Sequence, residues 1–161
     1  MRNVYIFDLD DTLYQVKDNQ YINKVDKQEL RKLNGIKILF SNATYGHVSI
    51  LMKELGITDI FNVVFTTDIL GGYKPNPLMY EKIMTLCDLN DSDNIYFFEN
   101  LAINLYPAKK YNWKTILIIP NDENIIISNN ESNNNKLLSK VDEWLDYKFD
   151  NINDALKFIN L

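Results

Sequence analysis

Cysteine and histidine are almost absent from this sequence, which holds one of each, Cys87 and His47. A single cysteine cannot form an internal disulfide, and one cysteine with one histidine cannot build a zinc cluster. Chains that fold without disulfides suit a reducing compartment. We therefore expect a cytoplasmic protein.

Long apolar runs and a basic surplus are missing as well. Residues 1–7 carry one arginine and an apolar run too short for a signal peptide, and no run reaches the length of a membrane span. Arginine occurs only at Arg2 and Arg31, and the net charge is −5. Such an acidic chain is a poor candidate for membrane association or nonspecific nucleic-acid binding.

The remaining composition is that of an ordinary globular protein. Of the 161 residues, 46% are hydrophobic and 24% are charged, which excludes bulk disorder. The length favours a single domain over residues 1–161, with one sizeable core. Asparagine is abundant, and the segment 128–135 is interpreted as an Asn-rich surface loop.

Apolar runs rich in β-formers alternate with segments of helical periodicity. Strands are predicted at residues 4–7, 36–40, 62–65, 95–98 and 115–119, with a small hairpin at 14–22 and a candidate short strand at 147–149. Helices are predicted at 26–34, 44–55, 76–87, 102–111, 136–145 and 152–159. This order predicts an α/β fold: a three-layer α/β/α core around a parallel sheet of about five strands.

In parallel sheets of this kind, reactive groups collect at the carboxyl ends of the strands. Four polar clusters stand where the pattern predicts that edge: Asp8-Leu9-Asp10-Asp11-Thr12, Ser41-Asn42-Ala43, Lys74-Pro75 and Glu99-Asn100. Each cluster alone is a weak signal, because acidic runs are usually solvated turns. Their common position at one sheet edge indicates a functional site.

The four clusters resemble the motifs of the haloacid dehalogenase-like (HAD) superfamily of phosphohydrolases. Motif one resembles the run from Phe7 to Tyr14, and motifs two and three resemble Ser41-Asn42 and Lys74-Pro75. The fourth is a variant, Glu99-Asn100 with Asn104. The resemblance covers roughly residues 3–119, and the runs Phe-Ser-Asn-Ala, Lys-Pro-Asn-Pro and Ile-Tyr-Phe-Phe are similar to the pyrimidine 5′-nucleotidase branch.

The resemblance implies a mechanism and a cofactor. Asp8 would be the nucleophile that forms an aspartyl-phosphate, and Asp10 the general acid and then base. Ser41 would hydrogen-bond a phosphoryl oxygen, and Lys74 would supply fixed positive charge. Mg²⁺, which prefers hard oxygen ligands, would be the cofactor.

The expected ligands of that Mg²⁺ are the Asp8 carboxylate, the Asp10 backbone carbonyl and a motif-four side chain, Asn100 or Glu99. Thr12, Asn42 and Ala43 are the candidate substrate-binding residues. Thr12 is also expected to order the turn after Asp10.

The fourth motif departs from the family pattern. Asn100 stands where the superfamily usually has aspartate, and Asn104 where a second aspartate is frequent. A neutral amide oxygen implies weaker metal binding, for which Glu99 could compensate. The alternative is a catalytically weak or inactive binding or regulatory protein on the same scaffold.

No cap domain fits into this chain. Only 22 residues separate Leu13 from Ile36, and the stretch between Asn42 and Lys74 is used by one predicted helix and one strand. An open site is compatible with a phosphorylated small molecule such as a nucleoside 5′-monophosphate. It is equally compatible with a larger phosphorylated partner, or with a cover provided by a second subunit in an oligomer.

For His47 and Tyr14, two interpretations each stay open. His47 is either a surface residue in the first turn of its helix or a contact to phosphate or substrate. Tyr14 either packs in the hairpin or lines the pocket mouth. Cys87 is expected to be a small buried hydrophobic residue, and Trp113 and Trp144 are expected to lie in the core or at an interface.

Overall fold

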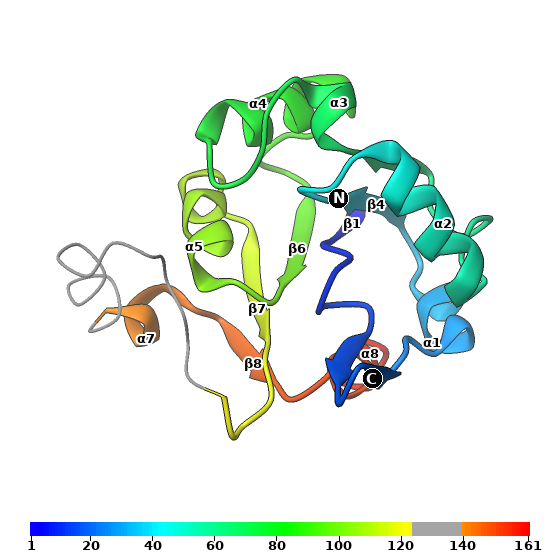
Figure 1. The fold of residues 1–161 in the computed structure, drawn as a ribbon. Helices are drawn as coiled ribbons and strands as arrows, with labels where there is room; N and C mark the ends of the chain where they lie inside the picture. The colour runs from blue at the N-terminus through cyan, green and yellow to red at the C-terminus, as the bar shows by residue number, and fades with distance from the viewer. Residues whose placement is uncertain (124–139) are drawn as a thin grey trace, which may run out of the picture.

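The computed structural model describes residues 1–123 and 140–161 and contains a six-stranded parallel sheet (Figure 1). The strands run in the order β5-β4-β1-β6-β7-β8, so the first strand lies near the middle. Their bounds are β1 (Asn3–Phe7), β4 (Ile36–Phe40), β5 (Val63–Phe65), β6 (Asn94–Glu99), β7 (Lys114–Ile118) and β8 (Tyr147–Phe149). The predicted α/β architecture is confirmed, with six strands rather than about five, because β8 pairs with β7 in parallel.

Helices cover both faces of this sheet. One face packs against α4 (Pro77–Leu86), α5 (Ala102–Leu105) and the 3₁₀ helix η1 (Tyr106–Tyr111), with Tyr80, Phe97 and Trp113 in its core. The other face packs against α1 (Lys27–Lys32), α2 (Tyr45–Leu55) and α8 (Ile152–Ile159). The two groups lie on opposite sides of the strands in Figure 1, which gives the predicted three layers.

The helix ends follow local rules. The Asn76 side chain accepts a hydrogen bond from the Leu78 backbone, and Pro77 takes the first helical position of α4. Helix α2 ends at Gly56, whose φ of 66° lies in the left-handed region that glycine tolerates best. These capping residues fix where each helix starts and stops.

Three details differ from the sequence-based expectations. The predicted helix 102–111 becomes a 3₁₀ helix from Tyr106 onward, since Pro107 lacks the N–H that an α-helix would use. A four-residue helix, α3 (Thr67–Leu70), lies between β5 and Lys74. The helix predicted at 136–145 is described only as α7 (Val141–Trp144), and the proposed loop 128–135 lies outside the described residues.

The chain connection from β1 to β4 contains a small hairpin and α1. The hairpin pairs β2 (Gln15–Lys17) with β3 (Gln20–Ile22) in antiparallel register. Neither this connection nor the one from β4 to Lys74 contains a cap domain, as expected. Among the described residues, no helix is both long and apolar enough to cross a membrane.

Candidate active site

The predicted site residues meet at the carboxyl edge of β1, β4 and β6. Phe7 pairs with Leu39 on one side and with Phe98 on the other, so the residues that follow emerge at the same level. A cavity of about 290 Å³ opens there. It is lined by Asp8, Asp10, Asp11, Asn42, Ala43, Lys74, Glu99, Asn100, Leu101 and Asn104.

A buried ammonium group organises the floor of this cavity. The Lys74 side chain has no exposed surface, and its Nζ donates to Asp8 Oδ1 at 2.9 Å and to Glu99 Oε2 at 2.8 Å. It also donates to the Phe40 carbonyl at 2.7 Å. Three strands therefore converge on one cation, which fixes the Asp8 carboxylate in place.

The charges of this cluster are strongly coupled. Burial alone would lower the pKa of Lys74, but the carboxylates of Asp8 and Glu99 outweigh burial and raise it. Burial raises the pKa of Glu99, and the neighbouring Asp8 adds to the rise. Lys74 therefore stays charged at neutral pH, as expected for a group that balances buried carboxylates.

Two side chains hold the second oxygen of Asp8. Thr12, which is buried, donates its hydroxyl to Asp8 Oδ2 at 2.7 Å. The Asn100 amide lies between Asp8 and Glu99; with Nδ2 turned towards them, it donates to Asp8 Oδ2 at 3.0 Å and to Glu99 Oε1 at 2.8 Å. The Thr12 hydroxyl thus restrains the nucleophile candidate, and Thr12, a candidate substrate-binding residue, does not itself line the cavity.

The same geometry fits a divalent cation. If the Asn100 amide turns its oxygen towards Asp8 Oδ2, two oxygens face each other 3.0 Å apart. That is about the separation of neighbouring oxygens around Mg²⁺ with bonds of about 2.1 Å. Among the described residues, no three His, Cys, Asp or Glu side chains form a metal-binding group, so a cation here would need the Asn100 amide and backbone oxygen.

Charge balance also favours a cation. Four carboxyl groups line the cavity, those of Asp8, Asp10, Asp11 and Glu99, against the single ammonium of Lys74. A phosphate dianion would meet net repulsion in such a cavity. A bound divalent cation would offset it.

Glu99 is occupied by internal hydrogen bonds. Besides Lys74, its Oε2 accepts from Asn104 Nδ2 at 3.2 Å. Its Oε1 accepts from the backbone N–H groups of Asn100 and Leu101 at 2.9 and 3.1 Å. With both oxygens engaged, Glu99 has less freedom than Asn100 to ligate a metal, and Asn104 acts as its support.

The second motif braces the site from β4. Asn42 accepts from the Lys74 backbone N–H at 2.7 Å and donates to the Lys74 carbonyl at 3.0 Å, so its amide clamps the Lys74 loop. Ser41 is buried and does not line the cavity, and its Oγ accepts from the Ala43 N–H at 3.0 Å. Asn42 and Ala43, the other two substrate-binding candidates, line the cavity.

Asp10 has two partners that the sequence did not reveal. The Tyr14 hydroxyl donates to Asp10 Oδ1, and His47 Nε2 lies 3.0 Å from the same oxygen. Tyr14 is buried, and burial together with the Asp10 hydrogen bond raises the pKa of its hydroxyl. His47 is half exposed, which agrees with its surface interpretation, and it also contacts Asp10.

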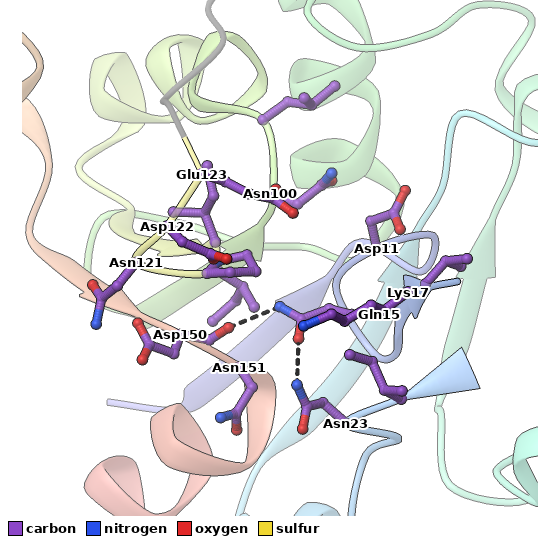
Figure 2. Close-up of a pocket in the computed structure, with 16 residues that line it drawn as sticks. Asp11, Gln15, Lys17, Asn23, Asn100, Asn121, Asp122, Glu123, Asp150 and Asn151 are labelled. Carbon is purple, nitrogen blue, oxygen red and sulfur yellow. Dashed lines mark hydrogen bonds between the residues drawn. The ribbon is translucent and has the colours of Figure 1, made fainter. Parts of the chain in front are cut away.

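A larger cavity of about 750 Å³ adjoins the first and shares Asp11, Asn100 and Leu101 with it (Figure 2). Its walls come from the β2–β3 hairpin, from the loop after β7 and from the loop before α8. Gln15 bridges two of these walls, since it donates to the Asp150 carbonyl at 2.8 Å and accepts from Asn23 at 2.7 Å. Carboxylates of Asp122, Glu123 and Asp150 also line the cavity.

Two comparisons relate this chain to known proteins. The family model for haloacid dehalogenase-like hydrolases matches residues 20–100, a segment that includes Ser41, Lys74 and Glu99. Asp8 lies before the matched segment.

Solved structures with the same fold include an L-2-haloacid dehalogenase from Xanthobacter autotrophicus with chloropropionic acid covalently bound (TM-score 0.61, 16% identity, 82% of this chain and 58% of that chain). A predicted phosphoglycolate phosphatase from Haemophilus somnus gives a TM-score of 0.60 at 16% identity, over 83% of this chain and 55% of that chain. The chain thus spans little more than half the length of these proteins. An uncharacterized protein from Listeria monocytogenes matches over 98% of this chain and 96% of its own length, with a TM-score of 0.63 and 14% identity.

Proposed function

The chain belongs to the haloacid dehalogenase-like hydrolases, and we propose that it is a Mg²⁺-dependent phosphomonoester hydrolase that forms an aspartyl-phosphate on Asp8. The observation that carries the proposal is the arrangement around Asp8. Its carboxylate lines the cavity, pairs with the buried Lys74 and has Asp10 beside it. Nucleophile, fixed positive charge and proton donor are the parts that phosphoryl transfer needs.

The first step is attack by a carboxylate oxygen of Asp8 on the phosphorus of the ester. The bond between phosphorus and the ester oxygen breaks, and Asp10 gives a proton to the departing oxygen, so an alcohol leaves. In the second step Asp10 takes a proton from water, whose oxygen attacks the phosphorus and releases inorganic phosphate. Asp8 and the protonated Asp10 are regenerated.

Lys74 and Thr12 prepare Asp8 for this attack. Lys74 keeps the carboxylate in a fixed position and offsets the charge of the phosphoryl oxygens. Thr12 restrains the other oxygen. Both groups are in place before substrate binds, so no reorganisation is needed during the reaction.

The residues that would hold Mg²⁺ are Asp8, Asn100 and the backbone carbonyl of Asp10. Asn100 is preferred over Glu99, because Glu99 already accepts four hydrogen bonds. When bound, the cation would neutralise charge on the phosphoryl group. A neutral amide ligand implies weaker binding than a carboxylate would give.

The second acid, Asp10, favours phosphoester hydrolysis over dehalogenation for this chain. A halide leaves as a stable anion and needs no proton, whereas an alkoxide leaving group does. Asp10 lines the same cavity as Asp8. A dehalogenase would have no use for a proton donor at this position.

The alcohol portion of the substrate is proposed to occupy the larger cavity beside Asp11 and Asn100 (Figure 2). Its volume is sufficient for a small organic ligand, and nucleoside 5′-monophosphates are the narrower proposal, which rests on the similarity to the nucleotidase branch. Since the described residues 1–123 and 140–161 place no cap domain over the site, a phosphorylated macromolecule is the other substrate class. A panel of nucleotides, sugar phosphates and phosphopeptides distinguishes the two.

Hydrolysis of p-nitrophenyl phosphate tests the activity itself. The wild-type chain is expected to release phosphate with Mg²⁺ and to stop when the metal is chelated. Asp8→Asn keeps the size of the side chain and is expected to remove turnover, while the surface variant Asp59→Asn serves as the matched control. Equal rates in wild type and Asp8→Asn would overturn the proposal, and no turnover by any substrate class would favour a non-catalytic binding protein.

A further inference from the structure

The Asp10 carboxyl group is held from one side only. The Tyr14 hydroxyl and His47 Nε2 both contact Oδ1, the first through a 2.5 Å hydrogen bond and the second at 3.0 Å. Oδ2 makes no hydrogen bond with the described part of the chain. The two oxygens of this side chain are therefore not equivalent.

Both partners come from elements that are fixed independently of Asp10. Tyr14 is buried and packs against Tyr21 of the hairpin, with ring centroids 4.8 Å apart. His47 lies in the first turn of α2, whose buried residues anchor the helix on the sheet. Asp10 itself lines the cavity that contains Asp8. The contacts thus restrain a carboxyl group that lines the cavity.

We infer that Tyr14 and His47 are positioning residues that assign the acid–base role to Oδ2 of Asp10. A tyrosine hydroxyl beside a carboxylate acts as donor, so Oδ1 is the oxygen that stays unprotonated. Oδ2, which has no hydrogen-bond partner in the described part of the chain, is the oxygen left available for the proton transfer of the proposed mechanism. This inference rests on the proposed phosphomonoesterase function and adds two residues that the proposed mechanism does not use.

The experiment compares substrates that differ in their need for a proton. The p-nitrophenolate ion is a good leaving group and needs no proton. Phenolate is a poorer leaving group, because the pKa of phenol is about 10, and it needs protonation as it departs. The quantity measured is kcat/KM with Mg²⁺, because it covers the steps up to alcohol release and excludes attack by water. Tyr14→Phe is expected to lower kcat/KM for phenyl phosphate by about tenfold and for p-nitrophenyl phosphate by less than about threefold.

Both donors hold the same oxygen, so their loss is expected to be more than additive. The double variant Tyr14→Phe with His47→Ala should lose about a hundredfold on phenyl phosphate. His47→Gln, which can return an N–H donor, should recover part of the loss caused by His47→Ala. The matched control is Tyr21→Phe, which alters the same hairpin but not the contacts of Asp10.

The outcomes separate the positioning role from the proposed function. If Tyr14→Phe lowers kcat/KM equally for both substrates, or for neither, the positioning role is overturned while the phosphatase proposal stands. A wild-type chain that hydrolyses neither substrate overturns both. A selective loss on phenyl phosphate, with unchanged thermal unfolding, supports the role.

Discussion

Replacing Lys74 with methionine tests the buried charge cluster at the centre of the site. Methionine keeps the length of the side chain but leaves the carboxylates of Asp8 and Glu99 without a counter-charge. Lys74 Nζ makes two hydrogen bonds to carboxylates and one to the Phe40 carbonyl. Charged hydrogen bonds contribute about 1.5 to 3 kcal/mol each, and breaking a buried pair costs about 3 to 5 kcal/mol.

We therefore expect Lys74→Met to lower the free energy of unfolding by about 3 to 5 kcal/mol at pH 7. The loss should depend on pH. Burial already raises the pKa of Glu99 to about 7, above its ordinary value of 4.5, and removing Lys74 raises it further. When the pKa of a carboxyl group is higher in the folded than in the unfolded state, its contribution to the free energy of unfolding is fully present below the unfolded pKa. That contribution is lost as the pH rises through the folded pKa.

Urea unfolding between pH 4.5 and pH 8, followed by circular dichroism, measures both effects. The variant should lose stability relative to the wild type as the pH rises. The double variant with Glu99→Gln removes one of the two uncompensated carboxylates and should recover part of the loss at pH 7. A Lys74→Met variant whose free energy of unfolding stays within about 0.5 kcal/mol of wild type at every pH, a margin typical of surface substitutions, would refute the buried cluster.

Three further predictions concern single side chains. Asn100→Asp supplies a charged oxygen and should lower the Mg²⁺ concentration for half-maximal activity several-fold, measured by metal titration; an unchanged titration would argue against Asn100 as a ligand. Thr12→Val removes the hydroxyl that donates to Asp8 Oδ2 and should cost about 1 to 3 kcal/mol of stability, measured by urea unfolding; an unaltered midpoint would contradict this contact. Gly35→Ala would place a Cβ 2.3 Å from the Asn3 carbonyl oxygen and should destabilise the fold by about 1 to 3 kcal/mol, and a thermal midpoint equal to wild type would exclude that close approach.

Most of the fold follows from local sequence features. The strand at 36–40 and the hairpin at 15–22 appear where β-forming runs predict them, and Asn76-Pro77 marks the start of α4. Helix α3 was missed, because four residues carry no amphipathic period and its end is set by the left-handed Gly71. The position of β8 as a sixth parallel strand depends on pairing with β7, which the sequence does not encode locally.

The candidate site likewise has a part that the sequence predicts and a part that depends on how distant elements pack. The order of the motifs along the chain predicts that Asp8, Lys74 and Glu99 lie at one sheet edge, because the carboxyl ends of parallel strands lie at a common level. The contacts of Asp10 with Tyr14 and His47 could not be predicted in this way. His47 lies 37 residues from Asp10 in the sequence, and their meeting depends on how α2 packs on the sheet.

The most direct test of the central proposal is to detect the phosphoryl group on Asp8. The wild-type chain is mixed with p-nitrophenyl phosphate and Mg²⁺, quenched rapidly in acid, and the peptide that contains Asp8 is analysed by mass spectrometry. The proposed mechanism predicts a gain of one phosphoryl group on Asp8 and none in Asp8→Asn. Turnover with no phosphoryl group on this peptide, or with the group on another residue, would contradict it.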